Sequence, residues 1–123
     1  MPENASGRRR HARVMLKEPI RDPTSGHHEV RILELSLRGA RVEHTVILRP
    51  GGTHRLHVPL PNRVVAIQCL VVWSEARGRV KGEKRGAGLR FHSGLEFRNL
   101  SSEIETQLAA YLQAEGLPAA DAS

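Results

Sequence analysis

Four arginines, Arg8, Arg9, Arg10 and Arg13, stand within six residues near the N-terminus. A guanidinium group is planar, stays charged at physiological pH, and presents its N–H donors as a fork that fits phosphates and the edge of guanine. The residues from Val14 onward start a strand-like apolar run and not a helix. The arginines therefore lie between an N-terminal tail and the first element of a fold. By itself the segment indicates a preference for anions, or a solvated basic tail.

A second stretch with candidate binding chemistry runs from Glu34 to Gly39, between two expected strands. The Glu34 carboxylate can accept hydrogen bonds from the N–H edge of a guanine, and the Ser36 hydroxyl can donate to a phosphate. Gly39 permits a close approach of the backbone or a positive φ. Such a pattern is common in turns, so it indicates a nucleotide site only in combination with the arginines.

The apolar pattern predicts the elements that position these two stretches. Alternating or continuous apolar runs indicate strands at 14–20, 29–36, 39–48, 53–60, 64–73 and 88–97. The connections are too short for crossover helices, so the pairing should be antiparallel, and the basic, glycine-rich stretch 76–86 should be a hairpin loop. An apolar stripe indicates a helix that begins at Ser101 or Ser102 and ends before Gly116, formed by Ile104, Leu108, Tyr111 and Leu112.

These elements sum to an all-β fold, a six-stranded antiparallel β-barrel with a C-terminal helix. We expect one domain at 8–116, with flexible tails at 1–7 and 117–123. Residues 1–98 hold all 19 Lys and Arg against 9 acids, so an anionic ligand should bind on this part of the chain.

Composition and motifs also exclude several classes of protein. Cys69 is the only cysteine, so no internal disulfide can form, and no apolar run is long enough for membrane insertion, which predicts a cytoplasmic protein. No pattern of catalytic residues or of a phosphate-binding loop occurs, so we expect no enzyme and no cofactor. The adjacent His27 and His28 lack a metal-ligand spacing, so we expect no metal site.

Taken together, the two polar stretches are more specific than either alone. Arg9-x-x-x-Arg13, followed about twenty residues later by Glu34-x-Ser36-x-x-Gly39, resembles the paired motifs of the PilZ domain, the bacterial receptor module for the second messenger cyclic di-GMP. The similarity covers roughly residues 8–115 and extends to Pro50-Gly51, Val71-Val72-Trp73 and the stretch 94–101. The family fold is a six-stranded antiparallel barrel with a C-terminal helix, as the apolar pattern predicts.

The resemblance implies a role for each matching residue. Arg9 and Arg13 would hold the phosphates and guanine edges of cyclic di-GMP as the N-terminal loop folds over the barrel, and Arg8 would accompany a stacked, two-molecule form of the ligand. Ser36 would contact phosphate or guanine, and Gly39 would let the backbone come close. Further ligand-binding candidates are Arg10, Arg38 and Trp73, of which Trp73 would be a stacking platform or, alternatively, part of the core. Ordering of the loop would then signal to an unidentified protein partner.

Glu34 departs from the family pattern, which has Asp or Asn at this position. The additional methylene moves the carboxylate outward, so Glu34 either bends to reach the same donors or pairs with an arginine and closes the site. In the second case the chain would be a PilZ-like adaptor that binds protein partners without nucleotide. A third alternative, a small basic barrel that binds RNA or DNA, is disfavoured by the shortage of aromatic residues.

Overall fold

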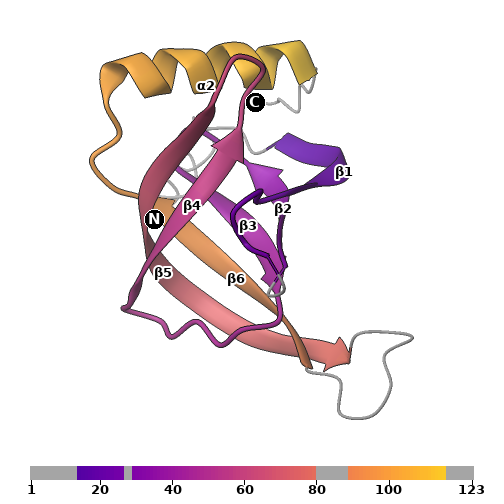
Figure 1. The fold of residues 1–123 in the computed structure, drawn as a ribbon. Helices are drawn as coiled ribbons and strands as arrows, with labels where there is room; N and C mark the ends of the chain where they lie inside the picture. Colours follow the sequence, from indigo (N-terminus) through magenta and orange to yellow (C-terminus); the bar gives the residue numbers. More distant parts are fainter. Residues whose placement is uncertain (1–13, 27–28, 80–88, 116–123) are drawn as a thin grey trace, which may run out of the picture.

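The computed structural model describes residues 14–26, 29–79 and 89–115. These described residues form one sheet and one helix, and the elements are β1 (Val14–Arg21), β2 (Val30–Leu35), β3 (Gly39–His44), β4 (Thr53–Pro59), β5 (Val64–Arg79), β6 (Leu89–Phe97) and α2 (Ser102–Glu115). Neighbouring strands pair antiparallel in the order β1-β2-β3-β6-β5-β4. The sheet curls into a half-barrel, and α2 lies across one end of it (Figure 1). The predicted fold class is confirmed.

The core lies on the concave face of the sheet, because successive residues of a strand point to opposite faces and the inward set is apolar. Fully buried side chains come from β2 to β6 and from α2, among them Ile32, Val42, Leu56, Ile67, Val71 and Leu108. The N-cap of α2 is Ser101, whose Oγ accepts the Ile104 backbone N–H at 3.1 Å, and this decides between the two serines that the sequence left open.

One buried carboxylate joins the two edges of the sheet. β1 and β4 are the edge strands, and in the described ranges no main-chain ladder connects them. Asp22, 2% exposed, follows β1 and accepts hydrogen bonds from Thr24 N and Oγ1, both at 2.8 Å. Its other oxygen accepts the backbone N–H of His57 on β4 at 2.9 Å. A side chain therefore closes the half-barrel where the backbone does not.

Two predicted strand ends are wrong. β3 ends at His44 and not at residue 48, because His44 Nδ1 lies 2.7 Å from the Val46 carbonyl oxygen and the chain turns there. β5 continues past Trp73 to Arg79, so residues 76–79, predicted as loop, are strand. β6 supplies the ladder for this extension, up to the pair of Arg79 with Leu89. The predicted tails at 1–7 and 117–123, and Gly116, lie outside the described residues.

A hydrogen-bonded chain of polar side chains crosses the core near the end of β3. His44 is 1% exposed, its Nε2 lies 2.7 Å from Ser93 Oγ, and Ser93 Oγ is hydrogen-bonded to Ser74 Oγ at 2.8 Å. Because Nδ1 faces a carbonyl oxygen, which can only accept, Nδ1 carries a proton, and the Ser93 hydroxyl donates to Ser74. The His44 ring also stacks on Phe91, with centroids 5.7 Å apart. Burial is the main cause that lowers the pKa of His44.

We expect Asp22→Ala to lower the free energy of unfolding by about 2–4 kcal/mol, because it leaves the donors of Thr24 and His57 without their charged acceptor. Urea unfolding measures this change. Glu29→Gln is the matched control, since the Glu29 carboxylate is half exposed and makes only surface ion pairs. Equal stability of the two variants would contradict a closing role for Asp22.

The buried histidine predicts a pH dependence of stability. An unfolded histidine has a pKa of about 6.5, and burial lowers the pKa of His44 and of His54 in the native chain. As the pH falls through the pKa of the unfolded histidines, the unfolded chain binds protons that the native chain does not. The free energy of unfolding therefore falls as the pH drops from about 7 to about 5. His44→Gln should be less stable at pH 7 but lose less on acidification, as followed by urea unfolding at several pH values. Parallel curves for the two proteins would contradict this assignment.

Candidate functional site

The position of Glu34 on the outer, convex face depends on a β-bulge. Val30 and Ile32 point into the core, so strict alternation would place Glu34 there as well. The register shifts between Ile32 and Glu34, which makes Leu33 an additional residue of β2. Glu34 then lies opposite Arg41 of β3, on the face away from the core. A bulge is a recurrent way to re-aim a side chain next to a functional site.

A second bulge does the same for Trp73 on β5. Val71 is buried, and alternation from Val71 would direct Trp73 inward. The register shifts between Val71 and Trp73, so Val72 is the additional residue and Trp73 pairs with Gly94 of β6. Trp73 is 38% exposed. The alternative that Trp73 belongs to the core is therefore not what the structure shows.

The two bulges align four residues in one row across the outer face. Glu34 of β2 is paired with Arg41 of β3, Arg41 with Gly94 of β6, and Gly94 with Trp73 of β5. Directly paired residues of an antiparallel sheet share a face, with Cβ atoms about 5 Å apart. We call Glu34, Arg41, Gly94 and Trp73 the outer row. It places a carboxylate, a guanidinium and an aromatic ring side by side.

Glu34 and Arg41 form an ion pair within this row. Arg41 Nη2 lies 3.1 Å from Glu34 Oε2, and the two side chains are 30% and 11% exposed. The longer side chain of Glu34 can thus reach an arginine, as the second alternative for this residue anticipated. Arg41 Nε is buried without a hydrogen-bond partner among the described residues, so the guanidinium keeps donor capacity beyond the ion pair.

Ser36 holds the turn between β2 and β3. Its Oγ accepts the backbone N–H groups of Arg38 at 3.0 Å and Gly39 at 3.1 Å, and it donates to the Gly39 carbonyl oxygen at 3.3 Å. A hydroxyl has one donor and two acceptor positions, and all three are used inside the hairpin. Ser36 therefore fixes the shape of the turn on which Arg38 sits.

Gly39 is required by packing against β6. A Cβ at this position would overlap the Leu95 carbonyl oxygen and lie 3.2 Å from the Leu95 carbonyl carbon. Its φ is not positive, since among the described glycines only Gly26, Gly51 and Gly78 have a positive φ. Of the two roles that the sequence allowed for Gly39, the structure shows the close approach, and the neighbour is the backbone of another strand.

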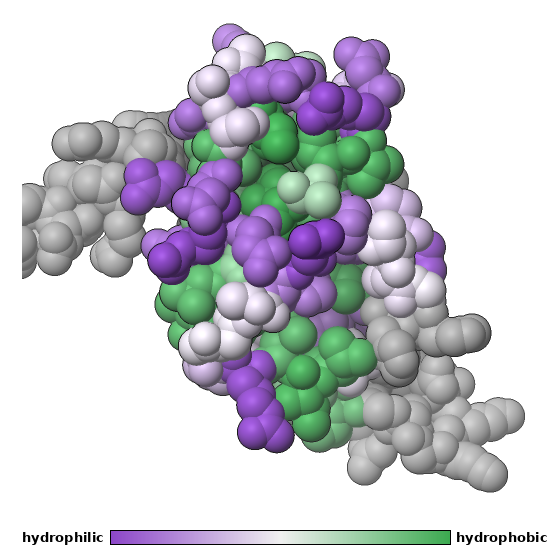
Figure 2. Space-filling view, turned by 60° about the vertical axis from the view of Figure 1, so that its left-hand side comes forward, coloured by the Kyte–Doolittle hydropathy of each residue, from purple (hydrophilic) through white to green (hydrophobic). Residues whose placement is uncertain are grey.

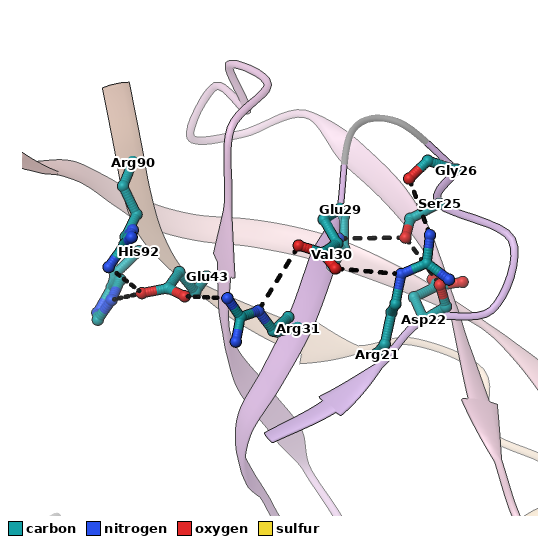
Figure 3. A network of polar contacts seen from close by, with 10 residues as sticks. All are labelled: Arg21, Asp22, Ser25, Gly26, Glu29, Val30, Arg31, Glu43, Arg90 and His92. Carbon is teal, nitrogen blue, oxygen red and sulfur yellow. Dashed lines mark hydrogen bonds and ion pairs between the residues drawn. The ribbon is translucent and has the colours of Figure 1, made fainter. Parts of the chain in front are cut away.

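A network of charges runs beside the outer row, two residues farther along β3. Glu43 lies 3.3 Å from His92 Nε2, 3.5 Å from an Arg90 nitrogen and 3.9 Å from an Arg31 nitrogen. Arg31 continues to Glu29, and Glu29 to Arg21, so the ion pairs cross from β6 to β1 (Figure 3). Each cation of this network is thus paired with a carboxylate. Figure 2 shows apolar patches on the surface, separated by a hydrophilic band.

The structure brings together part of the predicted site. Glu34, Ser36, Arg38 and Gly39 lie at or beside the β2–β3 hairpin, and Trp73 lies in the same row as Glu34. The candidates outside the described residues are Arg8, Arg9, Arg10 and Arg13. Cys69 is buried, and burial raises the pKa of its thiol to about 12, which fits an unreactive core thiol.

Sequence reasoning missed Arg41. The signal was present, because a turn centred on residues 37 and 38 sets the register that pairs position 34 with position 41. Opposite charges at those two positions indicate a cross-strand ion pair. Gly94 was missed for a different reason, since its partner Trp73 lies on a strand whose bulge no local pattern announces.

Comparisons with known proteins agree with this fold. The family model described as PilZ domain matches residues 7–114. Among solved structures, the PilZ domain of YcgR from Escherichia coli, determined with c-di-GMP, superposes with a TM-score of 0.62 at 19% sequence identity, over 87% of this chain and 90% of that one. No curated protein sequence matches. Within the described part of the chain, no helix is long and apolar enough to cross a membrane.

We expect Gly39→Ala to lower the free energy of unfolding by about 2 kcal/mol or more, because the new methyl group would push on the backbone of β6. Urea unfolding measures the loss. Gly52→Ala is the matched control, since its Cβ would meet only the Arg49 carbonyl oxygen, at 3.1 Å, and should cost less. Similar losses at both positions would show that the approach of β3 to β6 is not the constraint.

Proposed function

The chain belongs to the PilZ domain family, and on this premise we propose that it is a receptor for cyclic di-GMP and not an enzyme. The observation that carries the proposal is the outer row together with the strand that runs beside it. β1 starts at Val14, the residue after Arg13, and its second residue, Met15, is paired with Glu34. The arginine motif is therefore attached to the end of the strand that borders Glu34.

This arrangement suits a cyclic dinucleotide, which offers two phosphates and two guanine bases. Arg9 and Arg13 bind phosphate oxygens and guanine acceptor edges, and Arg8 and Arg10 add charge to the same segment. Glu34 accepts hydrogen bonds from a guanine N–H edge, for which its carboxylate must turn from Arg41 or be shared with it. Ser36 contributes by fixing the turn, so that Arg38 is presented beside the ligand.

The solved relative supports this choice of ligand. The YcgR PilZ domain, which shares the fold over most of both chains, was determined with c-di-GMP. The match of the family model begins at residue 7 and so includes the arginine motif. A compact anionic ligand also fits the strongly basic chain, whose formal net charge is +6.

Binding is converted into a signal by the N-terminal segment. Two ligand phosphates neutralise the arginines and hold the segment against the outer face, next to β1 and β2. The complex then presents a surface that the free chain lacks, and a downstream protein reads it.

One observation favours a second candidate function, an adaptor that binds protein partners without nucleotide. The Glu34 carboxylate is already engaged in an ion pair, with Arg41 Nη2 3.1 Å from Glu34 Oε2. If this pair is stronger than the guanine contact that would replace it, the site stays closed. The two candidates differ in one measurable property, the affinity for cyclic di-GMP.

Isothermal titration calorimetry of the full chain with cyclic di-GMP tests the proposal. The wild type should release heat and saturate, and Arg9→Ala and Arg13→Ala should bind about 10- to 100-fold more weakly, since each removes a charge-assisted hydrogen bond. Arg55→Ala is the matched control, because Arg55 is an exposed residue of β4 outside the outer row, and its substitution removes the same charge. The absence of heat with the wild type would rule out the receptor function, and equal affinity in all four proteins would rule out the arginine motif as the binding site.

Glu34→Asp separates the receptor from the adaptor. The shorter side chain restores the family residue and lengthens the distance to Arg41. If the wild type shows no thermal shift with cyclic di-GMP and Glu34→Asp gains one, the ion pair is what closes the site, and the adaptor function holds for the natural chain. If the wild type binds, Glu34→Asp should change the affinity by less than about tenfold, because a carboxylate is retained.

A further inference from the structure

Trp73 is the single tryptophan of the chain, and the outer face of the sheet displays it. Among the described residues it is the only large aromatic side chain that is exposed. A tryptophan on a surface is expected to cover apolar neighbours or to receive a ligand. The residue beneath the ring decides between these roles.

That residue is Gly94. A Cβ at position 94 would lie 2.7 Å from Cε2 and 2.8 Å from Cδ1 of Trp73, and closer still to Nε1. Cε2 and Cδ1 are the two ring atoms bonded to Nε1. If this Cβ lay in the plane of the ring, beyond Nε1, its distances to Cε2 and Cδ1 would both be longer than those found. The indole therefore lies with one face against the backbone of β6. Any side chain at position 94 would lift the ring from the sheet.

The bulge at Val72 and the absence of a side chain at Gly94 act together. The bulge turns Trp73 to the outer face, and Gly94 lets its ring lie flat there. A flat ring with one face on the sheet presents its other face outward, which is the geometry for stacking on a planar base.

The ring also lies at a suitable distance from the rest of the site. Arg41 is the other cross-strand neighbour of Gly94, and Glu34 lies one strand beyond. Three strand spacings, about 14 Å, separate Glu34 from Trp73. One base of a dinucleotide can thus be held at Glu34 while the ligand extends across Arg41 toward the indole.

We propose that Gly94 is a positioning residue that lays Trp73 flat on β6 as a stacking platform for a purine base of the bound nucleotide. The inference rests on the proposed function, because it assigns a further part of the same site. Gly94 does not touch the ligand and acts only through the ring.

The first test is the affinity for cyclic di-GMP of Trp73→Ala, Trp73→Phe and Gly94→Ala, measured by calorimetry on the full chain. Loss of a base–aromatic stack should weaken binding about 5- to 150-fold in Trp73→Ala. Trp73→Phe, which keeps a ring, should recover most of that loss. Gly94→Ala should weaken binding to an extent between these two, because the ring remains but no longer lies flat.

The double variant Trp73→Ala/Gly94→Ala tests whether Gly94 acts through the ring. Once the indole is gone, the methyl group at position 94 has nothing to displace, so the double variant should bind as Trp73→Ala does. An additional loss in the double variant would overturn the positioning role. If Gly94→Ala alone fails to fold and the double variant folds, the overlap with Trp73 is confirmed, and Trp73→Ala still tests the platform.

The emission of Trp73 gives an independent readout that a purely structural role would not change. Because the chain has one tryptophan, its fluorescence reports this ring alone. Stacking of a guanine should change the emission saturably, with the dissociation constant found by calorimetry. Heat of binding without a change in emission, together with an unchanged affinity of Trp73→Ala, would overturn the inference and leave the receptor function standing. No heat with the wild type would instead remove the receptor function itself.

Discussion

The pairing of β3 with β6 is the interaction on which the rest of the structure depends. The strand order places β1, β2 and β3 on one side of this pairing and β6, β5 and β4 on the other. Among the described strands, it is thus the one ladder that joins the two halves of the sheet. Gly39 lets the strands meet at the β2–β3 hairpin, where Phe97 N–H also donates to the Arg38 carbonyl oxygen at 2.8 Å. The outer row crosses the same junction, with Glu34 and Arg41 on one half and Gly94 and Trp73 on the other. Fold and candidate site thus rely on one contact between segments about fifty residues apart in the chain.

A single sheet serves both as the wall of a core and as a binding surface. Its concave face must be apolar, and two buried polar groups beside this core, Asp22 and the His44–Ser93 pair, are hydrogen-bonded. Its convex face is free to carry charge. The bulges at Leu33 and Val72 reverse the alternation of the side chains that follow, which moves Glu34 and Trp73 from the inward to the outward set. Each bulge interrupts the ladder locally, and in return Glu34 and Trp73 reach the outer face.

Much of the fold could be read from the sequence, because each strand and the helix carry their own apolar period. The ends of the strands could be predicted less well. β5 extends to Arg79 through polar and glycine residues that have no strand pattern, and only its pairing with β6 keeps them extended. The resemblance to PilZ domains supplied the motif residues at the β2–β3 hairpin. Arg41 was missed, although the turn itself defines the register that pairs it with Glu34. Gly94 and the orientation of Trp73 could not be inferred, since alternation along β5 points that ring into the core.

The sequence by itself determined the antiparallel all-β class, the helix with its apolar stripe, and the residue types at the two family motifs, since these depend on local periodicity and spacing. Tertiary structure decided which face each side chain occupies. A one-residue insertion in a strand reverses the direction of every side chain after it, and whether it occurs depends on the partner strand. For the same reason, tertiary structure decided that Glu34 pairs with Arg41, that the Ser36 hydroxyl is hydrogen-bonded within the turn, and that the indole of Trp73 lies on Gly94. These contacts link strands distant in sequence, and no local pattern contains them.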